Sequence, residues 1–130
     1  MAELNRDVNK RDMMLFGEEY DKAKYLGGIR RFGGLNAFRL SALLDAGFID
    51  ADEAQNDSPT TEEFLAFMKE HHDFTAFGYA VCPERDDYRI TIDGIESDVL
   101  FNTLDEVNDF FMLCRGADEL TITPPYAWWD

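Results

Sequence analysis

Two adjacent histidines and the aspartate after them are residues whose types suggest chemistry. His71, His72 and Asp73 follow the segment TEEFLAFMKE, and imidazole and carboxylate groups are common metal ligands and proton carriers. Neighbouring residues on a helix point about 100° apart, so both imidazoles cannot face one ligand. His71 instead continues the apolar stripe that Phe64 and Phe67 begin. The pattern favours a partly buried structural pair of histidines near the C-terminal end of a helix over a metal site.

Acidic residues around a predicted turn offer a second kind of chemistry. Asp86, Asp87 and Asp93 crowd the turn and exit of a predicted hairpin, where carboxylates can hold a hard cation. Together with His71 they are the candidate residues for a metal-assisted hydrolase, which is one alternative function. Their spacing does not match a calcium-binding loop, and no zincin, nucleophile-elbow or P-loop motif occurs in the sequence. We expect solvated strand ends here, without a metal or a cofactor.

A predicted helix near the C-terminal end of the chain carries an acidic face. At 100° per residue, Asp105, Glu106 and Asp109 fall together, opposite the apolar side of the helix. Met112 and Leu113 flank them, and acidic groups edged with apolar side chains are typical of a recognition surface. A merely solvated helix face is the alternative. The predicted apolar side comprises Leu104, Val107, Phe110, Phe111 and Cys114.

The chain ends on two adjacent tryptophans, which stand out in so acidic a sequence. Trp128 and Trp129 follow Pro124 and Pro125, which are expected to stop the preceding strand. Adjacent residues in an extended segment point to opposite sides. We therefore expect one tryptophan to enter the core and the other to stay exposed for a partner or self contact. A small structural or assembly protein that forms homodimers through this tail is a second alternative function.

Composition and charge restrict the class of protein. The 130 residues carry a formal net charge of -15, and a hydrophobic fraction of 45% is too high for a disordered acidic chain. We expect one domain over residues 1–130, with residues 1–34 as a possible separate segment. No long apolar run and no secretory signal occur, so we expect a cytoplasmic protein. Cys82 and Cys114 lack metal-site spacing and are expected to be reduced, buried thiols.

The acidic charge is concentrated after the first 39 residues. Residues 1–39 hold eight Lys or Arg against six Asp or Glu, whereas the remainder holds four against twenty-one. Such a field repels nucleic acid and anionic membranes and attracts basic surfaces. Direct nucleic-acid binding by the acidic part and membrane binding are therefore excluded in our expectation, and a basic protein surface is the expected partner.

Helix starts are marked by capping residues. Thr60 and Thr103 each precede a glutamate by three residues, which is the spacing of a capping box. Asn36 has the side chain of an N-cap, and Gly47 is expected to end that helix in a left-handed conformation. The patchy helical spacing nearer the start of the chain predicts a further helix over residues 4–25.

Alternating residues predict a small sheet. A hairpin is expected over residues 74–95 and a further strand over residues 118–123. Two glycine pairs, at residues 27–28 and 33–34, predict turns or a short hairpin. These elements predict an α+β fold with a small antiparallel or mixed sheet covered by helices and with a helical N-terminal part.

These observations favour a non-enzymatic acidic binding protein. In its most specific form it is a DNA mimic, because carboxylates spaced i, i+4 on a helix lie about 5–6 Å apart and can occupy a groove built for a polyanion. In size and acidity the chain is similar to anti-restriction and anti-CRISPR inhibitors carried by mobile elements, and this similarity is one of composition. It implies a partner that handles nucleic acid. The candidate partner-binding residues are Asp105, Glu106, Asp109, Met112, Leu113, Asp86, Asp87, Trp128 and Trp129.

Overall fold

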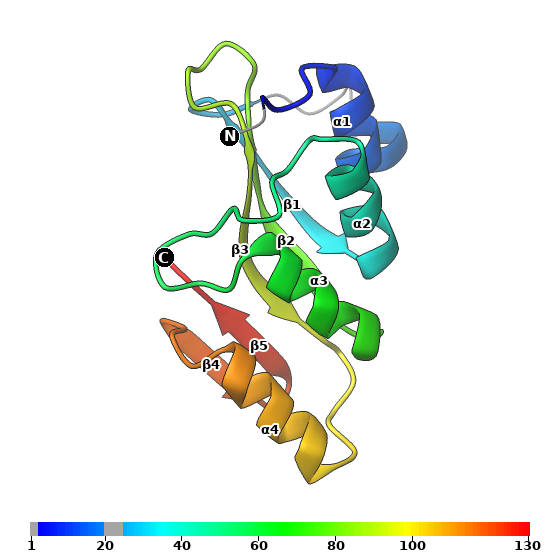
Figure 1. The fold of residues 1–130 in the computed structure, drawn as a ribbon, viewed down its shortest axis with the longest axis vertical. Coiled ribbons are helices and arrows are strands. Elements are labelled where there is room, and N and C mark those ends of the chain that lie inside the picture. Colours follow the sequence, from blue (N-terminus) through cyan, green and yellow to red (C-terminus); the bar gives the residue numbers. More distant parts are fainter. Residues whose placement is uncertain (1–2, 20–24) are drawn as a thin grey trace.

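One antiparallel sheet and the helices along one of its faces make up the fold (Figure 1). The computed structural model describes residues 3–19 and 25–130. The helices are α1 (Val8–Phe16), α2 (Ala37–Asp45), α3 (Thr61–Glu70) and α4 (Leu104–Leu113), with a 3₁₀ turn η1 (Gly17–Glu19). The strands are β1 (Ile29–Leu35), β2 (Thr75–Val81), β3 (Ile90–Glu96), β4 (Glu119–Ile122) and β5 (Pro125–Trp128). The predicted α+β class is confirmed.

The strands of the described chain are arranged in the order β1-β2-β3-β5-β4, and all neighbouring pairs are antiparallel. The hairpin predicted over residues 74–95 is formed by β2 and β3, and β4 lies within the strand predicted over residues 118–123. The sheet is larger than predicted, because β1 adds to the free edge of β2 and β5 lies between β3 and β4.

β1 corrects the prediction for the second glycine pair. The first pair, residues 27–28, forms the predicted turn, closed by a bridge between Leu26 and Ile29. The second pair lies within β1, where Gly34 has a φ of 63° and the register with β2 shifts between Phe32 and Leu35. An edge strand tolerates such a bulge. Pairing with β2, which local spacing does not encode, makes this segment a strand.

β5 is a further strand that the sequence did not predict, although the end of the chain is extended as expected. The chain reverses at the Thr123–Pro124 peptide bond, which is cis, and returns along β4. Pro125 is the first residue of β5, a position where the missing N–H of proline is tolerated. The two prolines therefore end one strand, as expected, but the second of them also begins another.

The capping residues act largely as predicted. Thr60 and Glu63 form the complete capping box at the start of α3. The side chain of Thr103 accepts a hydrogen bond from a backbone N–H in the first turn of α4, and Gly47 has a φ of 82° just after α2. The helix predicted over residues 4–25 is wrong in extent, because α1 ends at Phe16 and residues 20–24 lie outside the described chain.

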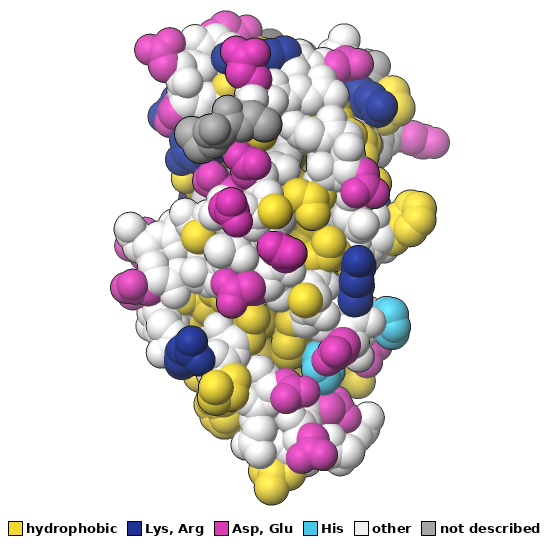
Figure 2. Space-filling model, in the orientation of Figure 1, with side chains coloured by type: hydrophobic (Ala, Val, Ile, Leu, Met, Phe, Trp, Pro, Cys, Tyr) yellow, Lys and Arg dark blue, Asp and Glu magenta, His cyan; other side chains and the backbone are white. Residues whose placement is uncertain are grey.

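The helix-covered side of the molecule carries many carboxylates. Figure 2 shows Asp and Glu side chains over the whole of this face, with apolar atoms visible between the helices. None of the helices in the described part of the chain is long and apolar enough to cross a membrane.

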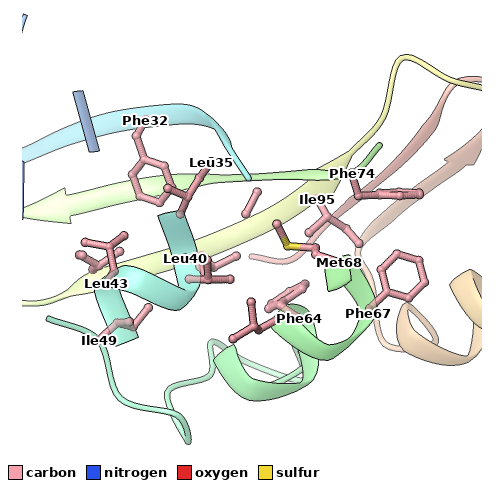
Figure 3. Close-up of a cluster of buried hydrophobic side chains, with 14 of the residues drawn as sticks. Phe32, Leu35, Leu40, Leu43, Ile49, Phe64, Phe67, Met68, Phe74 and Ile95 are labelled. Atoms are coloured by element: carbon pink, nitrogen blue, oxygen red, sulfur yellow. The ribbon is translucent and has the colours of Figure 1, made fainter. Parts of the chain in front are cut away.

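The core lies between the sheet and the helices. Leu40 and Leu43 of α2 and Phe64 and Met68 of α3 are buried together with Ile95 of β3 (Figure 3). Burying apolar side chains of this size contributes roughly 1.5–3 kcal/mol each to folding. The opposite face of the sheet has no helix over it in the described chain, so side chains there remain available for contacts.

Candidate functional site

The predicted recognition residues of α4 lie on or beside its exposed side. Asp105 and Asp109 are exposed, Met112 is 63% exposed, and Leu113 is half-buried. Glu106 is half-buried, and its carboxylate accepts a hydrogen bond from the Thr103 hydroxyl at 3.3 Å, so it belongs to the start of the helix. The acidic and apolar groups predicted to lie near one another on α4 therefore do so.

The apolar side predicted for α4 is partly wrong. Phe110 and Cys114 are buried, but Leu104 is 74% exposed and Phe111 is 41% exposed. α4 lies near the end of the molecule, over β4 and β5 (Figure 1), so only a narrow stripe of the helix meets the core. The surface of α4 is consequently more apolar than the sequence pattern predicted.

A groove of about 420 Å³ lies between α3 and α4, and we call it the α3/α4 groove. Its carboxylates are those of Asp57, Glu63, Glu70 and Asp109, and Arg115 is the single cation among its lining residues. Its apolar lining consists of Pro59, Phe67, Met112 and Leu113. The groove therefore combines an apolar lining with carboxylates that outnumber the one arginine by four to one.

One end of the α3/α4 groove depends on a glycine. A Cβ atom on Gly116 would lie 2.8 Å from the backbone oxygen of Asp57, so only glycine allows the two backbones to approach this closely. Asp57 itself has a φ of 58°, in the left-handed region. This contact sets the loop before α3 against the C-terminal end of α4.

His71 is partly buried at the C-terminal end of α3, as predicted, but its neighbour His72 is exposed, so the predicted buried pair is wrong for His72. Its ring packs against Phe67 with centroids 4.4 Å apart, and its Nε2 atom lies 3.5 Å from Oδ2 of Asp109. In the described chain, Glu70, His71 and Asp109 each bring one potential ligand atom within 4.8 Å of the others. The sequence places Asp109 far from the histidine, so this grouping was not predicted. The absence of a bound metal stays a prediction.

The acidic hairpin residues lie far from α4. Asp86 and Asp87 are in the loop between β2 and β3, at the opposite end of the molecule in Figure 1. Asp87 forms ion pairs of 2.8 Å with both Arg85 and Arg89. Hydrogen bonding to Arg89 lowers the pKa of this carboxyl. Asp87 is therefore an exposed but paired carboxylate.

The residues of the alternative hydrolase do not assemble in the described chain. Asp93 lies in β3 and is paired with Arg31, whereas His71 lies beside Asp109. Asp87 is held by arginines in the hairpin loop. A shared metal needs ligands that converge on one point.

The two tryptophans point to opposite sides of the sheet. Trp129 is fully buried on the helix side, where its ring makes an edge-to-face contact with Phe64 at 5.5 Å. Trp128 is half-buried on the other face, next to Gly94 in the paired strand. The expected core tryptophan is thus Trp129, while Trp128 is less exposed than expected.

The two cysteines are free and buried, in agreement with the sequence. Burial raises the pKa of the Cys114 thiol, at the C-terminal end of α4, to about 12. A thiol that resists ionisation is a poor nucleophile and a poor metal ligand. Cys114 therefore acts as a small core residue.

No family model, curated protein or solved structure matches this chain. The function is therefore inferred from the geometry of the described residues. That geometry brings three of the predicted partner-binding residues, Asp109, Met112 and Leu113, into one groove.

Proposed function

We propose that this chain is a non-enzymatic, cytoplasmic binding protein whose α3/α4 groove holds a basic segment of a partner protein. The observation that carries the proposal is the lining of the groove, where four carboxylates and one arginine surround apolar side chains. An apolar strip between carboxylates matches a segment that presents apolar and basic side chains together. Complementary charge accelerates association and selects the partner, while the apolar contacts supply most of the affinity.

Exposed apolar side chains on α4 and just before it support this proposal. Leu104, Phe111 and Met112 of α4 are all exposed, and Val99 and Leu100 are exposed just before this helix. Apolar side chains that gather on one surface and are bordered by charge mark protein–protein contact sites. Asp105 and Asp109, one helical turn apart, provide the bordering charge.

DNA mimicry is the most specific form of the proposal. Carboxylates at i, i+4 lie about 5–6 Å apart, and the net charge of -15 adds a long-range field that attracts DNA-binding surfaces. In this form the partner is a nucleic-acid-handling protein, and the chain inhibits it as anti-restriction or anti-CRISPR inhibitors do. Duplex DNA should then compete with the chain for the same partner.

The test is a pull-down from a host lysate with matched variants, at about 50 and 300 mM salt. The groove variant is Glu70→Gln with Asp109→Asn, and the control is Glu84→Gln in the hairpin loop. We expect the wild type and the control to retain a basic protein that high salt releases, because surface electrostatics is screened. The groove variant should retain at least ten times less of it.

Two results would contradict the proposal. One is the absence of any salt-sensitive partner, and the other is equal retention by the groove variant and the control. DNA mimicry is tested separately, by adding duplex DNA to the captured complex. If duplex DNA does not displace the partner, the hypothesis of DNA mimicry is wrong. The proposal that the groove binds a basic segment is unaffected by that result.

A further inference from the structure

The uncovered face of the sheet carries aromatic side chains. The register places Tyr79 beside Thr91, and Phe77 and Trp128 on either side of Gly94. These residues alternate with the buried helix-facing positions of the same strands, so they share the face without helices. Tyr126 stacks on Phe77, with ring centroids 5.6 Å apart and an angle of 12° between the ring planes.

A cleft of about 440 Å³ opens on this face, and we call it the sheet cleft. Its volume is in the range of sites that bind small ligands or single side chains. Residues from β1, β2, β3 and β5 line it, together with the loop before α3 and the end of the chain. The charged and aromatic side chains of its lining include those of Arg31, Glu53, Tyr79, Arg89, Asp93 and Trp128.

Asp93 is a buried carboxylate with a weak cationic partner. Its side chain is 7% exposed, whereas that of Arg31, at 3.4 Å, is 73% exposed. Exposed and long ion pairs contribute little. Burial raises the pKa of Asp93 although Arg31 opposes this shift, and burial also raises the pKa of Glu53. The carboxylates of the cleft are thus incompletely neutralised by the chain's own cations.

Arg89 is not available to bind a ligand anion. Its Nε donates to Thr91 at 2.9 Å, and its two terminal nitrogens donate to Asp87 at 2.8 Å and to the Tyr79 hydroxyl at 3.0 Å. These bonds fix the position of Tyr79. Arg31 is the other arginine of the lining, opposed by the carboxylates of Glu53, Asp93 and Asp130. A cation is therefore the ligand that the charges of the cleft favour.

We propose that the sheet cleft binds the guanidinium group of an arginine presented by the partner protein, with Asp93 and Glu53 as acceptors and Trp128 as the aromatic wall. This proposal rests on the proposed function, because it assumes a basic partner. Arg31 already places a guanidinium nitrogen against Asp93, and the incoming arginine replaces it there. A planar guanidinium forms paired bonds with carboxylates and stacks on aromatic rings, which an ammonium group does not do as well.

The test uses the tripeptide acetyl-Gly-Arg-Gly-amide, titrated into the full chain and followed by NMR and by tryptophan fluorescence. The control ligands are the same peptide with citrulline, which is neutral and of the same shape, and with lysine. We expect the arginine peptide to shift backbone resonances of β3 and β5 around the cleft. It should bind at least ten times more tightly than the citrulline peptide and more tightly than the lysine peptide.

Variants separate this site from the α3/α4 groove. Asp93→Asn should weaken binding of the arginine peptide at least tenfold, Glu53→Gln should weaken it less, and Asp109→Asn in the groove should leave it unchanged. A thermal melt of each variant shows whether it is folded. If Asp93→Asn does not fold, the variant of the half-buried Glu53 provides the test. Loss of partner capture by the groove variant, together with unchanged binding of the arginine peptide, would support both proposals.

Three results would overturn the cleft proposal. These are equal binding of the arginine and citrulline peptides, unchanged binding by both the Asp93 and Glu53 variants, and resonance shifts confined to α3 and α4. Inorganic phosphate is titrated as the anionic probe. If phosphate shifts the cleft resonances more strongly than the arginine peptide does, the cleft is an anion site and the proposal is wrong.

Discussion

The α3/α4 groove and the sheet cleft both contain carboxylates, but they use them differently. In the groove, Glu70 and Asp109 are exposed and only Arg115 opposes the negative charge. In the cleft, Asp93 is buried and an arginine lies at 3.4 Å. Exposed carboxylates attract cations at a distance, and salt screens this attraction. A buried carboxylate is costly unless a cation or hydrogen-bond donor contacts it directly. The first arrangement attracts a basic surface, and the second selects one group on it.

The two regions also depend on different parts of the fold. The walls of the groove are helices whose starts are capped locally. The cleft depends on strand register, because residues of β1, β2, β3 and β5 all line it. The close packing of these strands also needs a glycine after Asp93, because a Cβ atom on Gly94 would lie 2.5 Å from the Phe77 ring and 2.1 Å from the Ala127 oxygen. Changes to a cap should therefore lower stability and leave the lining of the groove largely in place, while changes to the strands should disrupt the cleft as a whole.

The two tryptophans give the largest expected contrast between the two faces. Trp129→Ala should lower the free energy of unfolding by about 3–5 kcal/mol, because it removes a fully buried ring from the helix-side core. Trp128→Ala should lower it by about 1 kcal/mol or less and weaken arginine binding in the cleft instead. Urea denaturation followed by circular dichroism measures both. Equal decreases in the free energy of unfolding for the two variants would mean that Trp128 contributes as much to folding as Trp129 does, which would contradict the prediction.

The capped helix starts should have a smaller effect. Thr60→Ala and Thr103→Ala should each lower the free energy of unfolding by about 1 kcal/mol, through loss of the hydrogen bond to the first turn. Capture of the partner by the groove should change little, because neither threonine lines it. Chemical denaturation and the pull-down test this together. A neutral result for stability would contradict the role of the cap.

The buried carboxylate of Asp93 should change how the free energy of unfolding depends on pH. We expect this change to be smaller than the loss of stability caused by removing a helix cap. Burial raises the pKa of Asp93 in the folded protein. As pH falls, the Asp93 carboxyl therefore binds its proton at a higher pH in the folded state than in the unfolded state. The contribution of this proton to the free energy of unfolding is present at low pH and is lost as pH rises through the pKa of the folded state. Asp93→Asn should therefore gain most stability relative to wild type near pH 7, and the gain should shrink toward about pH 4.

Asp87→Asn serves as the contrasting variant for this pH measurement. Hydrogen bonding to Arg89 lowers the pKa of Asp87, so its contribution is present at neutral pH and lost as pH falls. The two variants should therefore differ from wild type with opposite signs near pH 7. Denaturation curves at pH 4 to 7 provide the measurement. If both variants change the free energy of unfolding near pH 7 in the same direction, Asp93 is sufficiently neutralised by its neighbours in the folded protein, and this prediction is wrong.

Metal should have the smallest effect on either region. We expect EDTA to leave the melting temperature unchanged, because the sequence contains no metal-binding motif. Differential scanning calorimetry with EDTA, and with added zinc, magnesium or calcium, tests this. A rise of several degrees with zinc that His71→Ala abolishes would instead assign a site to Glu70, His71 and Asp109 at the edge of the groove.

The acidic and apolar surface of α4 was predictable in outline, because helical periodicity assigns side chains to faces. The sequence placed Asp109 and Met112 outside the apolar side of this helix, and both line the groove. Periodicity could not show how far the helix is covered. The exposure of Leu104 and Phe111 follows from the position of α4 over the end of the sheet, which is a property of packing alone.

The sheet cleft was not predictable, because its residues come from distant parts of the chain. Arg31 and Asp93 are 62 residues apart, and they meet only because β1 and β3 flank β2. The sequence predicted one exposed tryptophan near the end of the chain, but it could not show that Trp128 belongs to a strand between β3 and β4.

The sequence by itself determined the features that depend on neighbouring residues. These are the caps at Thr60 and Thr103, the β2–β3 hairpin and the acidic field. The tertiary structure decided the pairing of β1 and β5, and it decided that Arg11 is fully buried, bonded to the Val81 carbonyl oxygen 70 residues away. The reason is physical: caps and turns are satisfied by bonds within a few residues, whereas strand partners and buried charges are chosen by contacts that form only when the whole chain is packed.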